Sequence, residues 1–253
     1  MSCPNRQRKT VPLKLLTWNI QAAIGTARFT DYLIRAHRQV FHTPAKASTL
    51  DTIAETVRGA DLVCLQEVDL GGRRAGYRCQ ANAIAERSGH DHLALQENRV
   101  IRGVSRHGNA ILSRFPLSNV RDLKLPGRVP GRGCLIATVG AETPFDVACV
   151  HLSLGRRDQE LQLDFLSRHL PENGRWVVMG DFNCSLHASP AEAFLEKMHA
   201  HFDRQPEPTY PSWRPMRDYD HILTGPAMKL GQYRPGPEIC SDHLNVSAEL
   251  DAD

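Results

Sequence analysis

The sequence contains no uninterrupted apolar stretch long enough to cross a bilayer, so no transmembrane helix is expected. The polar, basic residues 1–10 are not followed by the apolar core of an export signal. Seven cysteines are scattered without a Cys-x-x-Cys pair, and this spacing gives neither a zinc knuckle nor a disulfide framework. Cys64 and Cys149 lie in apolar runs, where a thiol behaves as a small hydrophobic side chain. Reduced thiols without an export signal predict a cytoplasmic protein.

Internal repeats, low-complexity blocks and linkers are also missing, so we expect a flexible segment over residues 1–12 and a single domain over 13–253. With 41% hydrophobic and 23% charged residues, the chain has enough apolar material for a sizeable core. The formal net charge of +3 suits a polyanionic substrate, but a solvated basic surface explains it equally well. We also expect a monomer.

Short β-rich runs alternate with helical patterns along the chain. Strands are predicted over residues 13–18, 62–66, 110–113, 135–139, 147–151, 176–180, 221–224 and 246–250. An i, i+3, i+4, i+7 spacing from Leu50 to Val57 predicts an amphipathic helix that ends near Gly59. Similar spacings predict helices that end at Gly89 and before Pro171. Because several strands follow one another directly, two packed mixed sheets with outer helices fit better than a βα barrel.

Acidic and amide side chains stand where predicted strands begin or end. They are Glu67, Asp181, Asn183, Asp220 and Asp242. One acid at a strand end is more often a turn residue, but a carboxylate beside a buried run is costly to desolvate unless it meets a cation or a donor. Several such places, with oxygen and imidazole groups and no thiols, indicate a site for Mg²⁺ or Mn²⁺.

His243 directly follows Asp242, and Asp220 opens the preceding predicted strand. A carboxylate that accepts from one imidazole nitrogen leaves the other nitrogen free to take a proton from water. We therefore expect His243 and Asp220 to form an acid–base pair.

Seven short motifs occur in order along the chain: TWNI at 17–20, LQEV at 65–68, HGNAILSR at 107–114, VHL at 150–152, GDFN at 180–183, DHIL at 220–223 and SDH at 241–243. Each is weak alone, but the ordered set resembles the endonuclease/exonuclease/phosphatase superfamily, which includes DNase I. The resemblance covers nearly the whole chain. It implies an α/β (α+β) fold, a DNase I-like four-layer α/β/β/α sandwich of two mixed sheets, and a single catalytic domain over 13–253.

The resemblance also implies a metal-dependent phosphoester hydrolase in which Glu67 is the principal metal ligand and Asn19 and Asp242 lie close by. Mg²⁺ is the expected ion, and Mn²⁺ suits the same ligands. In the abasic-site nucleases of the superfamily an acid stands two positions after the asparagine, whereas this chain has Gln21. That departure weakens the match to the abasic-site nucleases.

By the same resemblance, Asp181 and Asn183 orient the attacking water and hold a phosphate oxygen. His243 is the general base, steadied by Asp220. His151 binds phosphate or assists the leaving group, in a place where abasic-site nucleases use tyrosine. The implied reaction is in-line attack on phosphorus.

Substrate contacts are expected from the side chains around two of the motifs, namely Asn109, Arg106, His107 and Gln21. Residues 99–132, rich in Arg, Gly and Pro, are predicted to be mostly loops around one hairpin, and 205–215 to be a second, Pro-rich loop. In the segment 28–41, Phe29, Leu33, Ala36 and Val40 share one helical stripe and arginines occupy other faces. We prefer a helix packed on the protein's own core, and a helix that lies on an anionic membrane is the alternative.

Three functions remain open from the sequence. The first is a phosphodiesterase that acts on nucleic acid, in the manner of an endonuclease. The second is a hydrolase of phospholipids, similar to the sphingomyelinases, or of small phosphoesters. The third and weakest is a binding module without catalysis, because every expected catalytic position is filled.

Overall fold

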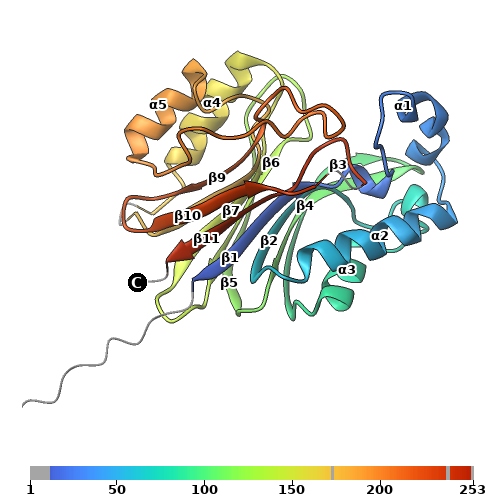
Figure 1. The fold of residues 1–253 in the computed structure, drawn as a ribbon, viewed down its shortest axis with the longest axis horizontal. Helices are drawn as coiled ribbons and strands as arrows, with labels where there is room; N and C mark the ends of the chain where they lie inside the picture. The colour runs from blue at the N-terminus through green and yellow to red at the C-terminus, as the bar shows by residue number, and fades with distance from the viewer. Residues whose placement is uncertain (1–11, 172–173, 238–239, 252–253) are drawn as a thin grey trace, which may run out of the picture.

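Two mixed β-sheets pack face to face, with helices on the outer face of each, in the computed structural model (Figure 1). The structure describes residues 12–171, 174–237 and 240–251. The predicted four-layer α/β/β/α sandwich is therefore confirmed, while the expected flexible segment 1–12 lies outside the described residues except for Pro12. Within these three ranges, no helix is both long and apolar enough to traverse a membrane.

The first sheet has six strands in the order β10-β11-β1-β2-β4-β3. Its strands are β1 (Leu13–Asn19), β2 (Leu62–Asp69), β3 (His92–Ile101), β4 (Ser105–Ser113), β10 (Lys229–Pro235) and β11 (Val246–Asp251). Helices α2 (Pro44–Val57) and α3 (Gln80–Ser88) cover its outer face (Figure 1). The pairing of β1 with β2 is parallel and that of β1 with β11 is antiparallel, so the sheet is mixed.

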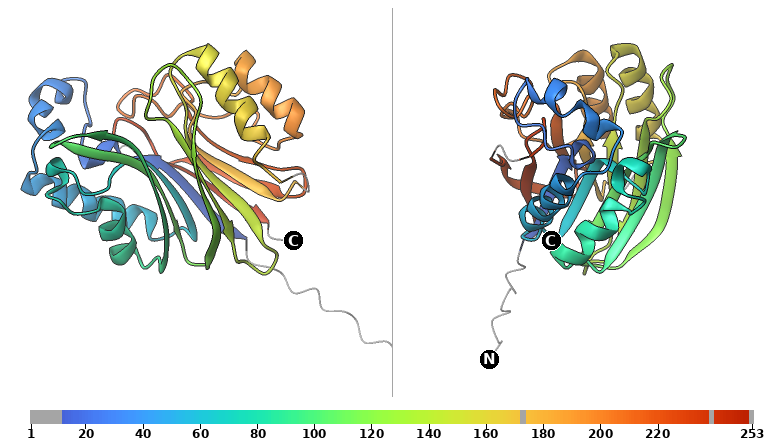
Figure 2. Two further views of the ribbon diagram at one scale, coloured as in Figure 1. Left: turned by 180° about the vertical axis from the view of Figure 1, so that it is seen from behind. Right: turned by 90° about the vertical axis from the view of Figure 1, so that its right-hand side faces the viewer.

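The second sheet has five strands in the order β5-β6-β7-β8-β9. They are β5 (Leu117–Lys124), β6 (Gly133–Val139), β7 (Phe145–His151), β8 (Trp176–Asp181) and β9 (Asp220–Thr224). Helices α4 (Arg156–Ser167) and α5 (Ser189–Met198) cover its outer face, and Figure 2 shows the two pairs of helices on opposite sides of the sandwich. Shorter elements are α1 (Asp31–Ile34), η1 (Gln21–Ala23), η2 (Ala36–Gln39) and η3 (Arg73–Ala75).

The central strands are buried on both faces, which explains their continuous apolar runs. Successive side chains of a strand point to opposite faces, so Leu15 of β1 joins the core between the sheets while Leu16 packs toward α2 and α3. On the second sheet, Cys149 likewise faces the inner core and Val150 faces α4 and α5. Both cysteines predicted to be structural, Cys64 and Cys149, are fully buried as free thiols.

Four strands end at one edge of the sandwich. Strands β1 and β2 are parallel, and so are β7 and β8, so each pair brings its last residues to the same place. We call this place the carboxyl edge, defined by Asn19, Glu67, His151 and Asp181 at or near the ends of these strands. The candidate site residues were predicted from strand ends, and the topology explains why they meet.

Four regular elements were not predicted: β3, β5, β10 and α5. The interpretation of residues 99–132 as mostly loop is wrong, because the end of β3, all of β4 and all of β5 lie there. Strand β5 is at the edge of its sheet, and most of its side chains are exposed or half-exposed. An edge strand of this kind carries polar residues on both faces, so it lacks the apolar run that marks a buried strand.

The preferred interpretation of segment 28–41 as a helix on the core is also wrong. The segment forms one turn of α1 followed by η2, and it lies near the N-terminal end of α2 (Figures 1 and 2). Phe29, Leu33 and Ile34 are 72%, 80% and 69% exposed. No layer of the described structure covers them, so their helical spacing does not correspond to burial.

Gly108 of β4 provides a test of the close contact between β3 and β4. A Cβ at this position would lie 1.9 Å from the carbonyl oxygen of Gln96, an impossible approach. We expect Gly108→Ala to lower the free energy of unfolding by about 1–3 kcal/mol, since the strands must separate. Urea denaturation measures the change. Gly59→Ala is the control, because nothing lies within 4 Å of its added Cβ; equal losses in both variants would contradict the argument.

Candidate active site

Asp181, the last residue of β8, is the centre of a hydrogen-bonded cluster at the carboxyl edge. Its side chain is only 1% exposed. Oδ1 accepts from the backbone amide of Asn183 at 2.9 Å, and Oδ2 accepts from Nδ2 of Asn19 at 3.0 Å. Since Asn19 ends β1, this second bond joins the two sheets across the sandwich.

Two imidazoles approach the same oxygen of Asp181. Nε2 of His151 lies 3.4 Å from Oδ2, and Nε2 of His243 lies 3.8 Å from it. His151 ends β7, whereas His243 comes from the loop before β11. Asn183 lies two residues after Asp181, in the loop that follows β8, and its Nδ2 donates to the carbonyl oxygen of Leu152 at 2.9 Å.

Burial and the neighbouring charges shift the pKa values of all three groups in this cluster. Loss of solvent raises the pKa of Asp181 to about 7, although the nearby His243 opposes the shift. Burial alone would lower the pKa of His243, but the carboxylates of Asp220 and Asp181 outweigh it and raise that pKa well above its usual value. Burial and the cationic Arg132 hold the pKa of His151 far below its usual value, so this ring is neutral. His243 is therefore the more basic of the two imidazoles and His151 the less basic.

His243 is held by a chain of hydrogen bonds. Its Nδ1 lies 2.8 Å from Oδ2 of Asp220, which also accepts from the hydroxyl of Thr209 at 2.6 Å. The ring of Tyr210 packs against the His243 ring with centroids 4.7 Å apart. Ser241 and Trp18 fix the loop from the other side, because Ser241 Oγ donates to the Asn19 carbonyl and Trp18 Nε1 donates to the His243 carbonyl. The imidazole therefore has one orientation, with Nε2 toward Asp181.

A second group of oxygens lies beside this cluster. Burial and the nearby carboxylate of Asp242 raise the pKa of Glu67. Oδ2 of Asp242 accepts from Nε2 of Gln21 at 3.0 Å and from the hydroxyl of Tyr32 at 2.7 Å. Among the described residues, Oε1 of Gln21 is buried without a hydrogen-bond partner.

These oxygens fit a hard divalent cation. The carboxylate of Asp242 makes ionisation of Glu67 more costly unless a positive charge lies nearby. The amide oxygen of Gln21, which has no partner among the described residues, is a ligand of the same hard oxygen class. Ligand atoms of Asp181, Asp220 and His243 also come within 4.8 Å of one another. In that second set Asp220 already bonds His243, and Asp181 already accepts from Asn19 and Asn183, so Glu67 and Asp242 are the better candidates.

The predicted substrate-binding residues divide into two groups. Asn109 and His107 line a cavity of about 140 Å³ together with Glu67, His151 and Arg132. Oδ1 of Asn109 is buried there without a partner among the described residues, and burial lowers the pKa of His107 to about 3. Arg106, in contrast, pairs with Glu97 at 2.5 Å on the half-exposed face of β4 and does not line this cavity.

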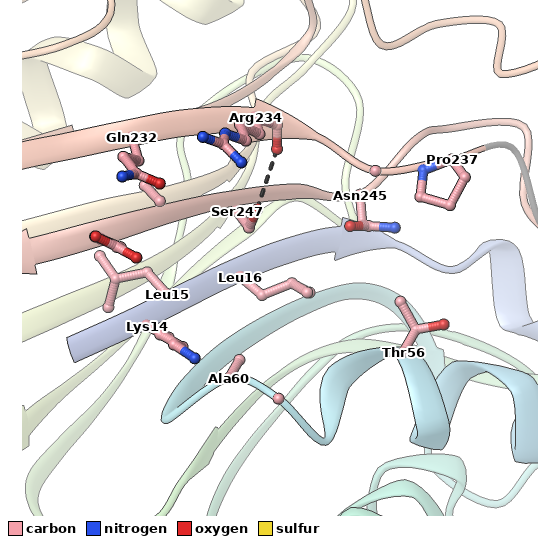
Figure 3. A pocket seen from close by; sticks show the side chains of 14 residues that line it. Lys14, Leu15, Leu16, Thr56, Ala60, Gln232, Arg234, Pro237, Asn245 and Ser247 are labelled. Atoms are coloured by element: carbon pink, nitrogen blue, oxygen red, sulfur yellow. Dashed lines mark hydrogen bonds between the residues drawn. The ribbon is translucent and has the colours of Figure 1, made fainter. Parts of the chain in front are cut away.

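A larger hollow of about 380 Å³ lies on the outer face of the first sheet, between β10, β11 and the end of α2 (Figure 3). Lys14, Thr56, Arg234 and Asn245 are among its lining residues, and none of the candidate site residues belongs to it. Chemistry is therefore expected at the carboxyl edge and not in the larger hollow.

The sequence matches the profile of the Endonuclease/Exonuclease/phosphatase family over residues 16–243. The chain belongs to this family. No curated protein matches it at the sequence level. Members of the family are hydrolytic phosphoesterases, so the chain is a phosphoester hydrolase in general terms. The ordered motifs had predicted this membership.

Several solved structures share the fold at low sequence identity. An endonuclease/exonuclease/phosphatase from Beutenbergia cavernae is 22% identical with a TM-score of 0.75, covering 95% of this chain and 71% of that one. The human Nocturnin catalytic domain, solved with bound sulfate, is 20% identical with a TM-score of 0.69 and covers 94% and 93%. A mannosyl-6-phosphatase from Bacteroides thetaiotaomicron is 17% identical with a TM-score of 0.65 and covers 94% and 99%.

Among the side chains that touch the site without having been predicted for it are Tyr32, Thr209 and Arg132. Tyr32 and Thr209 each donate to a site carboxylate, and the guanidinium of Arg132 contacts Nε2 of His151. Arg132 lies at the end of the Arg-rich segment 99–132, and the sequence does not distinguish it from the other arginines there. Thr209 lies in the predicted Pro-rich loop 205–215, but no spacing in the sequence connects it with Asp220.

Gln21 provides a test of the oxygen group in this family member. We expect Gln21→Glu to destabilise the protein by about 2 kcal/mol without divalent cations, because a carboxylate would replace the donor 3.0 Å from Asp242. Added Mn²⁺ should raise the melting temperature of this variant more than that of the wild type. Gln80→Glu, which disturbs a bond to the Ala22 carbonyl, is the control and should respond to cations as the wild type does. Equal cation responses in both variants would show that position 21 does not reach the cation.

Proposed function

We propose that this family member is a Mg²⁺-dependent phosphodiesterase that activates water for in-line attack on a phosphoester. The observation that supports this most directly is the convergence of two imidazoles on one buried carboxylate oxygen, at 3.4 and 3.8 Å, beside a pair of carboxylates. A phosphoryl group has charge on several oxygens and an attacking and a leaving group on opposite sides. The site offers donors and acceptors in several directions, as such a group requires.

In this proposal His243 takes the proton of the attacking water. Asp220 accepts from Nδ1, which leaves Nε2 available, and the buried carboxylate stabilises the imidazolium that forms. Asp181 receives a hydrogen bond from Asn19 and orients the water from its other side. Because the proton acceptor and the orienting carboxylate are 3.8 Å apart, a water molecule that lies beside this pair would be within hydrogen-bond distance of both.

The phosphoryl oxygens would lie toward His151, Asn183 and Arg132. Arg132 is the cation nearest to the neutral His151, and both line the cavity that also contains Glu67. Donors fixed in place before reaction stabilise developing negative charge without reorganisation. Asn109 adds a buried amide on the wall of this cavity.

Glu67, Asn19 and Asp242 would hold the cation. When bound, Mg²⁺ supplies positive charge next to the phosphoryl oxygens and the leaving group. Mn²⁺ would bind the same oxygens. Gln21 and Tyr32 orient Asp242 for this role through their two hydrogen bonds.

The similar structures support the phosphoester class. One is named a mannosyl-6-phosphatase, and another holds a sulfate, an anion with the shape of phosphate. A nucleic-acid phosphodiester and a phospholipid head group are the two substrate classes that we carry. The exposed apolar residues of segment 28–41 favour the phospholipid, while the basic loops at Arg128 and Arg132 are compatible with both.

Removal of the proton acceptor and removal of the cation test this mechanism. We expect His243→Ala to lower turnover of bis(p-nitrophenyl) phosphate by at least ~10² in kcat, and EDTA to abolish turnover until Mg²⁺ or Mn²⁺ is returned. His92→Ala, a half-buried histidine at the start of β3, is the control and should keep wild-type rates. Activity that survives EDTA would rule out the metal mechanism.

The same assay on plasmid DNA, anionic phospholipid vesicles, sphingomyelin and inositol phosphates identifies the substrate class.

Thr209 tests the orientation of His243. Thr209→Val keeps the shape of the side chain but removes the 2.6 Å hydrogen bond to Asp220. We expect kcat to fall roughly tenfold with KM unchanged, since the acid–base pair loses orientation while the binding groups remain. Thr209→Ser, which keeps the hydroxyl, should recover most of the rate. If KM rises instead and kcat is constant, Thr209 acts on the binding loop and not on His243.

A further inference from the structure

Large apolar side chains gather on the surface around the mouth of the site. On one side, segment 28–41 exposes Phe29, Leu33 and Ile34, each more than two-thirds accessible to solvent. The three apolar clusters that form the core of the described structure include none of these residues. Their exposure therefore contributes nothing to folding, although burial of apolar surface is favourable by about 25 cal/mol per Å².

The exposed segment is built into the site and held in place. Tyr32 donates to Asp242 at 2.7 Å, and its ring meets the Trp213 ring edge-on with centroids 5.9 Å apart. Asp31 accepts from the amides of Ala27 and Arg28, at 2.9 and 3.1 Å, and pairs with Arg35 at 3.3 Å. These contacts fix the backbone while the apolar side chains point away from it, so the exposure is a property of an ordered segment.

Other loops continue this surface around the mouth. Val129 is 59% exposed and lines the same cavity as Glu67 and His151. Leu154 is 74% exposed and follows His151 by three positions. Met216 is 67% exposed, and its amide donates to the Tyr210 carbonyl in the loop that packs on His243. We define the apolar rim as Phe29, Leu33, Ile34, Val129, Leu154 and Met216.

Positive charge accompanies every part of the apolar rim. Each of its four segments carries an exposed arginine: Arg28, Arg128, Arg157 and Arg214. Two of these segments have almost no acidic residues, since the only acid between residues 25 and 50 is the buried, paired Asp31, and 126–133 contains none. The other two segments have acids nearby, at Asp158, Glu160 and Asp218. An apolar surface bordered by arginine is complementary to a layer of acyl chains beneath anionic head groups.

We propose that the apolar rim docks this protein on an anionic lipid surface, with the mouth of the site toward the phosphoester head groups. A single-stranded nucleic acid would also attract the arginines, but it needs aromatic faces on which bases stack. Five of the six rim residues are aliphatic or Met and offer no such face, whereas all six can enter the acyl boundary. Hydrolysis of the head group rests on the phosphodiesterase function proposed above; docking itself does not.

The test is co-sedimentation of the full chain with vesicles, in EDTA so that no turnover occurs. We expect binding to vesicles that mix phosphatidylcholine with phosphatidylserine, and weaker binding to phosphatidylcholine alone. The triple variant Phe29→Ser, Leu33→Ser, Ile34→Ser should lower the partition coefficient by at least ~10-fold, since three apolar anchors are lost. Val120→Ser with Leu161→Ser is the matched control, because these side chains are 51% and 50% exposed on β5 and α4.

Several outcomes would overturn the proposal. If the triple variant binds vesicles as well as the wild type does, the apolar rim does not carry docking. The same holds if the control variant loses as much binding as the triple variant. If the wild type binds neither kind of vesicle, docking is refuted. Salt-sensitive retention of single-stranded DNA that depends on the three residues, without vesicle binding, would assign the rim to nucleic acid. Turnover of the soluble bis(p-nitrophenyl) phosphate should be unchanged in the triple variant, so failure of docking and failure of the catalytic proposal are separate results.

Discussion

The hydrogen bond between Asn19 and Asp181 is the contact on which the geometry of the site depends. It joins the last residue of β1 to the last residue of β8, so it connects the two sheets at the carboxyl edge, where the candidate site residues meet. A carboxylate buried there costs several kcal/mol unless donors surround it. Asn19 and the Asn183 amide supply those donors, one from each sheet. The same desolvation raises the pKa of Asp181 toward neutrality, so the structural constraint and the proton chemistry have one cause.

Left-handed backbone occurs at three of the candidate residues around this contact. Gln21, Glu67 and Asn183 have φ values of 46°, 57° and 52°, which non-glycine residues adopt at a cost of about 1–3 kcal/mol. Each is compensated locally: the Gln21 amide donates to Asn19 and the Asn183 amide donates to Asp181, while Glu67 lies at a shift in the register between β2 and β4. The shift interrupts the alternation of side chains along β2. Strain of this kind turns the polar side chains out of the buried strands and toward one another.

The sequence predicted those parts of the site that follow from strand ends. An apolar run that stops near Glu67 or Asp181 indicates where a buried strand ends. Parallel pairing then brings the end of β1 next to that of β2, and the end of β7 next to that of β8. Thr209 and Tyr32 could not be found in this way, because their contacts depend on the path of loops and connect residues 11 and 210 positions apart. Edge strand β5 was missed for a related reason, since its exposed residues carry no apolar periodicity. A periodic pattern of apolar residues therefore predicts burial only where another layer of the protein covers that face.

Segment 28–41 has an apolar pattern but no covering layer, and its exposed residues lie beside the candidate site. Its apolar spacing is the same whether the side chains meet the core or solvent, so the sequence left both interpretations open. The structure places no layer over Phe29, Leu33 and Ile34, yet it fixes the segment to the site through Tyr32 and Asp242. Apolar residues that served folding would be covered by another layer of the protein. Apolar residues without any role would not need the hydrogen bond by which Tyr32 holds their segment to Asp242. The connection makes the orientation of Asp242 depend on the same segment that carries half of the apolar rim. The hydrogen bond of 2.7 Å thus places the segment that would meet a lipid surface directly beside the proposed cation-binding group.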